Sequence, residues 1–103
     1  MRDRQVRLRK DHYTFVQDSA FTLSGLVREA LDQIIDGELE FPSERSRDTK
    51  GHELTRTAVT VTDEHDEYID SHDVVFSVFV HKVIEKRIER ERKLKDWEPE
   101  NDW

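Results

Sequence analysis

The chain contains no cysteine among its 103 residues. This absence excludes a disulfide framework, cysteine-based zinc sites and thiol chemistry, and it favours a reducing compartment. No apolar stretch approaches the ~18 residues that a membrane-spanning helix needs. The charged start Met1–Arg4 leads into no apolar run of the kind that marks a signal peptide. We therefore expect a cytoplasmic protein that has no membrane partner.

Motifs of catalysis and cofactor binding are also missing. The chain has only three glycines, with no glycine-rich phosphate loop and no nucleophile elbow. We therefore expect neither an enzyme nor a cofactor. The five histidines show no H-x-x-x-H spacing, so packing between helices explains them more simply than a metal site does, and we expect no metal. These histidines are His12, His52, His65, His72 and His81.

Positive charge is scarce and unevenly placed, since the formal net charge is −7. Residues 1–10 carry a net charge of +4 and residues 84–96 a net charge of +2, which leaves −13 on the remainder. An acidic chain argues against nucleic acid as a binding partner, but the basic N-terminal segment could still contact it. The carboxylate-rich composition resembles that of proteins from organisms with molar internal salt. We favour a halophilic source, an archaeon or its virus, over an ordinary acidic mesophilic protein.

The most informative feature is an internal repeat with a spacing of 53 residues. When the chain is shifted by this spacing without gaps, His12 meets His65 and Ser24 meets Ser77. The apolar positions superpose as well. The matched pairs are Val6/Val59, Leu8/Val61, Phe15/Tyr68, Val16/Ile69, Phe21/Val74, Leu23/Phe76, Leu26/Phe79, Val27/Val80, Ala30/Val83, Leu31/Ile84 and Ile35/Ile88. A gap-free register of this length predicts two copies of one structural unit.

Each copy has the pattern of a strand followed by two helices. The alternation of apolar and polar residues in Gln5–Arg9 and Ala58–Thr62 predicts two half-buried strands. A short helix follows each strand, and then an amphipathic helix with a wide apolar stripe. Units of this size rarely have a sufficient core of their own, so the two must share one. We expect units at residues 1–36 and 57–96, a linker at 37–56 and an acidic tail at 97–103.

This pattern resembles the ribbon-helix-helix family of the Arc, MetJ and CopG type. The segment Thr22–Leu31 is similar to the family's helix-two signature, and Val75–His81 is a weaker version with His81 in place of Arg28. In that family two strands pair, which satisfies their backbone groups, and the paired strands enter the DNA major groove. The resemblance implies a mainly α fold with a two-stranded antiparallel β-ribbon, namely a tandem, pseudo-dimeric β-α-α repeat. Pairing within one chain or between two chains would satisfy the strands, and we favour the former.

The same resemblance implies which side chains would contact DNA. Strand residues that face away from the core would meet base edges, and arginine and glutamine suit guanine and adenine. Helix-two N-termini offer amide donors to phosphate, and basic residues near the N-terminus add charge. The predicted base-reading residues are Gln5, Arg7, Arg9, Thr60 and Thr62. The predicted phosphate-binding residues are Arg2, Arg4, Lys10, Thr22, Leu23, Ser24, Phe76 and Ser77.

We therefore expect a sequence-specific DNA-binding transcriptional regulator, most simply a repressor, whose partner is double-stranded DNA and which could self-associate on it. One alternative is an antitoxin that binds its operator and holds a toxin with the charged helix Lys82–Asp96. Another is a dimerisation module that binds no DNA, which the net charge and the uncharged second strand favour.

Overall fold

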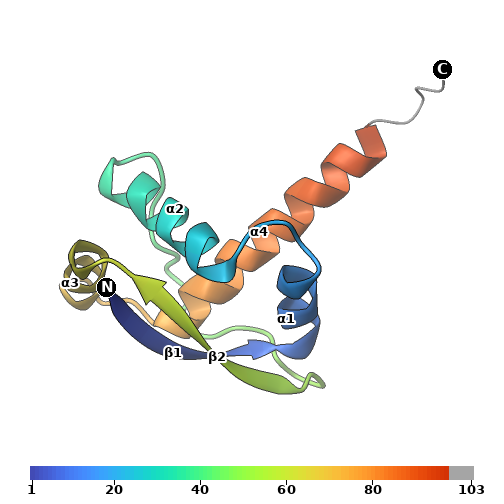
Figure 1. Ribbon diagram of the computed structural model, residues 1–103, viewed down its shortest axis with the longest axis horizontal. Helices are drawn as coiled ribbons and strands as arrows, with labels where there is room; N and C mark the ends of the chain where they lie inside the picture. The colour runs from blue at the N-terminus through green and yellow to red at the C-terminus, as the bar shows by residue number, and fades with distance from the viewer. Residues whose placement is uncertain (98–103) are drawn as a thin grey trace.

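The computed structural model describes residues 1–97, with side chains described up to residue 93. The tail predicted at 97–103 therefore lies, apart from Trp97, outside the described residues. The described part is a small compact α/β protein with four helices and one two-stranded antiparallel sheet (Figure 1). None of the described helices is long and apolar enough to cross a membrane. The elements in chain order are β1 (Arg2–Arg9), α1 (Lys10–Gln17), α2 (Leu23–Ile35), β2 (Leu54–Val61), α3 (Asp63–Asp70) and α4 (Phe76–Trp97).

The two strands pair antiparallel within this one chain, as predicted, and Gln5 lies opposite Ala58. Both strands begin earlier than the alternation indicated, at Arg2 and at Leu54, and β2 ends at Val61. A ladder continues for as long as the partner strand offers backbone groups, whether or not the side chains alternate in polarity. The linker predicted at 37–56 is therefore too long by three residues, because the last of them belong to β2.

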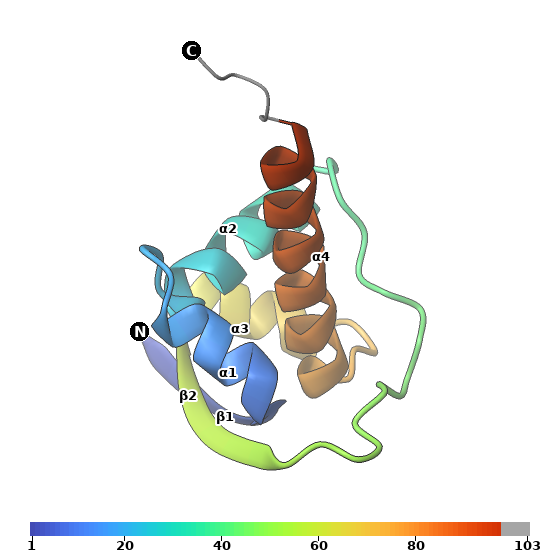
Figure 2. The same cartoon turned by 90° about the vertical axis from the view of Figure 1, so that its right-hand side faces the viewer.

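One face of the sheet is covered by the helices and the other is left open, as both ribbon views show (Figures 1 and 2). The covered face carries the side chains that the alternation predicted to lie in the core. Burial of these apolar side chains is the main force that holds the helices on the sheet. They are Val6, Leu8, Val59 and Val61, and they pack with Val16, Val27, Leu31, Ile69, Val80 and Ile84.

Hydroxyl side chains and a glycine define the helix ends. The Thr22 hydroxyl caps α2 by accepting a hydrogen bond of 3.0 Å from the Gly25 amide. Thr62 caps α3 in the same way, accepting from the His65 amide at 3.1 Å. Gly37 follows α2 with a φ of 83°, a conformation that glycine adopts without strain. These residues fix where α2 begins and ends.

The segment between α2 and β2 is docked rather than free. It runs outside α4 on its way to β2 (Figure 2). Phe41 packs edge-on against Phe79 of α4, with ring centroids 5.3 Å apart, and Leu39 also contacts the core. Further along, the Arg47 guanidinium donates to the Arg7 carbonyl on the outer edge of β1. These contacts make the segment part of the folded unit, which its lack of periodicity did not predict.

Candidate nucleic-acid interface

The open face of the sheet carries the side chains that alternate with the buried ones. In β1 these belong to Asp3, Gln5, Arg7 and Arg9, and in β2 to Leu54, Arg56, Ala58 and Thr60. No described helix covers this face (Figures 1 and 2). A two-stranded ribbon with one open polar face has the dimensions that the DNA major groove admits.

Arg7 and Arg56 lie directly opposite each other on this open face. Both residues are exposed, and no ion pair is recorded for either side chain within residues 1–93. Like charges directly opposite on a sheet disfavour folding, so a bound anion or base would relieve an unfavourable contact here. The sequence-based prediction missed Arg56 because it assigned this residue to the linker. No alternation of apolar and polar residues marked the continuation of β2 back to Leu54, which places Arg56 in the strand.

Two other predicted base-reading residues are already engaged by carboxylates. The Arg9 guanidinium holds the Asp11 carboxylate with two hydrogen bonds, of 2.6 and 3.0 Å, and these lower the pKa of that carboxyl. The Thr60 hydroxyl donates to the Asp3 carboxylate at 2.9 Å. Gln5 and Arg7 are exposed beside them. The structure therefore leaves Gln5, Arg7 and Arg56 as the polar side chains of this face that are available to a ligand.

Thr62, the fifth predicted base-reading residue, lies outside the strand and caps α3. We expect Thr62→Ala to lower the free energy of unfolding by about 1 kcal/mol, since it removes a cap acceptor. Base preference should not change. Urea unfolding and binding to a panel of DNA duplexes measure the two effects, and Thr62→Ser is the matched control that keeps the cap. A change of base preference at unchanged stability would show that Thr62 reads DNA after all.

The N-termini of α2 and α4 lie at the two edges of the sheet, α2 beside β2 and α4 beside β1. At the start of α2, the Ser24 hydroxyl accepts a 2.9 Å hydrogen bond from the Thr60 amide, which ties this end of the helix to the edge of β2. Helix α4 contacts β1. Among the described residues, the first amide with a recorded acceptor is that of Gly25 in α2 and Val78 in α4. The amides before them, at Leu23, Ser24, Phe76 and Ser77, are the predicted phosphate donors.

The basic residues predicted to bind phosphate are largely paired with acids. Arg4 lies on the covered side of β1, 2.6 Å from the Asp66 carboxylate and with its guanidinium over the Phe76 ring. Lys10, the first residue of α1, is 3.4 Å from a Glu53 oxygen, and Arg2 is 3.5 Å from Asp63. Arg4 is therefore held against the fold, whereas Arg2 and Lys10 form exposed ion pairs in which a phosphate could replace the carboxylate.

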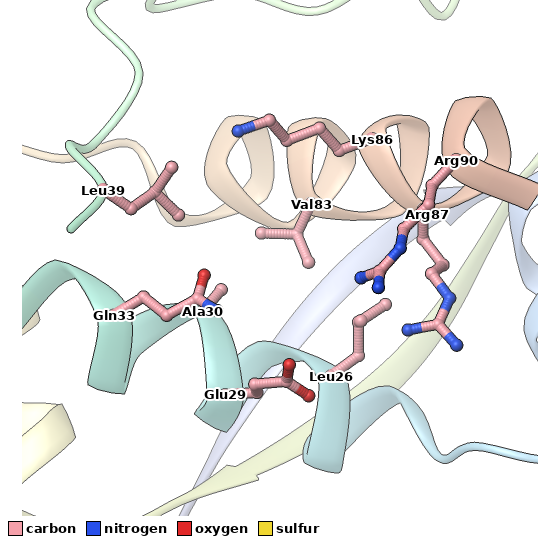
Figure 3. A pocket seen from close by; sticks show the side chains of 9 residues that line it. All are labelled: Leu26, Glu29, Ala30, Gln33, Leu39, Val83, Lys86, Arg87 and Arg90. Atoms are coloured by element: carbon pink, nitrogen blue, oxygen red, sulfur yellow. The ribbon is translucent and has the colours of Figure 1, made fainter. Parts of the chain in front are cut away.

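A second surface feature is a groove between α2 and α4 (Figure 3). Leu26, Ala30 and Val83 form its apolar floor, and the side chains of Arg87 and Arg90 lie along its α4 rim. The groove belongs to the helical layer and contains no residue of the sheet. It is thus a separate surface from the open face.

Comparison with known protein families, with characterised proteins and with solved structures finds no match to this chain. Function must accordingly be argued from the chain's own residues. The open face, with its unpaired arginines between two helix N-termini, is the strongest candidate site among the described residues.

Proposed function

We propose that the protein is a sequence-specific DNA-binding regulator of the ribbon-helix-helix kind, acting as a repressor in the cytoplasm. The observation that carries this proposal is the exposed pair Arg7 and Arg56 on the open face of an antiparallel ribbon. Arginine donates two hydrogen bonds to guanine in the major groove, the commonest specific contact between protein and DNA. Gln5, beside the pair, suits adenine in the same way.

The register of the ribbon supports a tandem, pseudo-dimeric architecture. Gln5 and Ala58 are repeat mates, 53 residues apart, and they lie directly opposite each other. A two-fold axis through this pair would relate β1 to β2 and would carry each residue onto its repeat mate. Two units related in this way resemble a ribbon-helix-helix dimer formed within one chain.

A pair of backbone contacts supports the same two-fold relation. Arg28 of α2 donates to the Thr60 carbonyl at 3.1 Å, and Arg47 donates to the Arg7 carbonyl. Arg7 and Thr60 are repeat mates. Each strand edge therefore receives a guanidinium at the equivalent carbonyl, although the second donor comes from the linker.

The ribbon is asymmetric along its length. Arg7 and Arg56 form a basic cross-strand pair on one side of the central Gln5–Ala58 pair, while Asp3 and Thr60 form a pair on the other side. The base-reading residues predicted from the sequence had their arginines, Arg7 and Arg9, on β1 alone. Because Arg56 belongs to β2, we now expect base preference to be concentrated under one end of the ribbon. Two chains bound side by side could still assemble a palindromic operator.

A mobility-shift experiment with the promoter of the protein's own gene, in potassium salt, tests the proposal directly. A discrete complex that resists competition by unrelated duplex DNA would support it. A failure to shift this promoter and a randomised duplex pool alike would favour the dimerisation module instead.

We expect the affinity for DNA to fall only gently as salt rises. The slope of log affinity against log salt is about −0.9 for each phosphate neutralised, and few cations near the ribbon are free of acid partners. With roughly two to four phosphate contacts, the slope should lie between about −2 and −4. Fluorescence anisotropy over a potassium chloride series measures it. A slope near −10 would reveal a basic surface that the present assignment lacks.

A protein partner is the second candidate function, and the groove between α2 and α4 favours it. Its apolar floor and basic rim suit a helix that is apolar on one face and acidic beside it. An antitoxin would use such a surface, together with the charged part of α4, to hold a toxin. Co-expression with the product of a neighbouring gene, followed by size-exclusion chromatography, tests this candidate independently of DNA.

A further inference from the structure

Two buried histidines and a glutamate converge where α1 packs on α4. The imidazoles of His12 and His81 have ring centroids 4.7 Å apart and are 3% and 1% exposed. Glu85 lies one turn after His81, with a carboxylate oxygen 3.3 Å from His81 Nε2. One ligand atom from each of the three residues lies within 4.8 Å of the other two. The expectation of no metal rested on the spacing of histidines along the chain, and that spacing does not show that His12 of α1 and His81 of α4 meet.

We propose that His12, His81 and Glu85 bind a divalent transition-metal ion, and that Zn²⁺ fits them best. Two imidazoles and one carboxylate are a zinc donor set, with water or another ligand in the fourth position. Zinc–ligand bonds of about 2.0–2.2 Å place tetrahedral ligands about 3.3–3.5 Å apart. The His81–Glu85 pair already has this spacing, and the ligand atom of His12 lies within 4.8 Å of both.

The hydrogen bonding of these rings is incomplete. No hydrogen bond of the His12 ring is recorded among the described residues, and the Nδ1 atoms of His12, His65 and His81 are all buried without a hydrogen-bond partner. Buried polar groups in native proteins are nearly always satisfied, so the His12 ring, which has no recorded partner, needs one such as a bound ion or water. Burial also lowers the pKa of His12 to about 4 and depresses the pKa of His81. Burial thus favours the neutral imidazole, which is the form that ligates metal.

The equivalent place in the other half shows why the site occurs once in the described chain. There His65 bonds to the Asp32 carboxylate at 2.7 Å, and Arg28 occupies the position that matches His81. The Arg28 guanidinium is needed at the Thr60 carbonyl. In the half that carries His81, Arg47 of the linker supplies the guanidinium instead. Because Arg47 provides this guanidinium, position 81 can hold a histidine that ligates metal.

The test begins with the untagged full-length protein, stripped of metal with EDTA and dialysed. Titration calorimetry with zinc chloride should give one ion per chain, and a zinc concentration about a hundred times the Kd should raise Tm by roughly 10 °C or more. Cobalt chloride should give the intense visible bands of a tetrahedral site. Absence of stoichiometric binding, or no change in Tm at saturating zinc, would overturn the proposal.

Variants separate this site from adventitious binding. Glu85→Gln should weaken zinc binding at least tenfold while the protein remains folded, because the Glu85 side chain is 43% exposed. His12→Gln should abolish the cobalt bands. Asp32→Asn, at the repeat mate of Glu85, is the matched control and should bind zinc normally. If Glu85→Gln binds as tightly as the parent while a His52→Gln, His72→Gln double variant does not, the ion lies on surface histidines and the proposal is wrong.

Discussion

Under the proposed function, replacing Arg7 by alanine is expected to weaken sequence-specific DNA binding by about 1–3 kcal/mol, the value of one bidentate contact to guanine. This corresponds to a roughly 5- to 150-fold rise in Kd. Arg56→Ala should have an effect of the same size, because Arg56 lies opposite Arg7 on the same open face. The double variant should lose specific binding and retain only the weak affinity for any duplex. Fluorescence anisotropy with specific and randomised duplexes measures both.

The stability of these variants distinguishes a functional role from a structural one. Removing one of two opposed like charges relieves a repulsion, so urea unfolding of Arg7→Ala should show unchanged or slightly higher stability. Arg90→Ala, on the groove rim, is the control with the same change in net charge. Binding that is lost equally in Arg90→Ala and Arg7→Ala would mean that total charge, and not the ribbon, determines affinity. In that case the assignment of the open face would be wrong.

Phe79→Ala is expected to lower the free energy of unfolding by about 3–5 kcal/mol, a typical cost for truncating a buried aromatic ring. Phe79 is 1% exposed and contacts both Phe41 of the linker segment and Phe76 of α4. Its loss would leave a cavity and would release the linker segment from the core. Because natural domains are stable by about 5–15 kcal/mol, this loss is a large fraction of the total stability.

Leu26 provides the matched comparison, because it is the repeat mate of Phe79. It is only partly buried and lies on the floor of the open groove, so Leu26→Ala should cost roughly 1 kcal/mol. Urea unfolding monitored by circular dichroism compares the free energies of unfolding of the two variants. Equal costs at the two positions would mean that the halves are packed alike and that the groove is closed in solution.

Much of the fold could be predicted from the sequence, because the same weak pattern of apolar residues occurs twice, 53 residues apart. The alternation around Val6 and Leu8 recurs at Val59 and Val61, and all four side chains are buried on one face of the sheet. A strand pattern that recurs at equivalent positions of the two copies makes a stronger prediction than either pattern alone. The same argument placed the apolar stripes of α2 and α4.

The parts that were missed depend on tertiary contacts that leave no periodic trace. Arg56 joins β2 because β1 extends far enough to pair with it, and nothing in its own neighbourhood alternates between apolar and polar. Phe41 is a lone aromatic in a polar segment, and only the position of Phe79 shows what it packs against. Ion pairing is equally hidden, since the engagement of Arg9 by Asp11 requires the geometry of the strand end.

Both strands of the sheet come from one polypeptide, and this changes how a regulator of this kind would respond to its own abundance. A regulator assembled from two copies loses its active form on dilution, so its occupancy of DNA rises steeply with expression. Here the ribbon is complete in every folded molecule. Under the proposed function, occupancy of a single site would follow expression in a graded, hyperbolic manner. Even a few molecules per cell would still bind DNA. A change in gene dosage would change the occupancy of the site roughly in proportion.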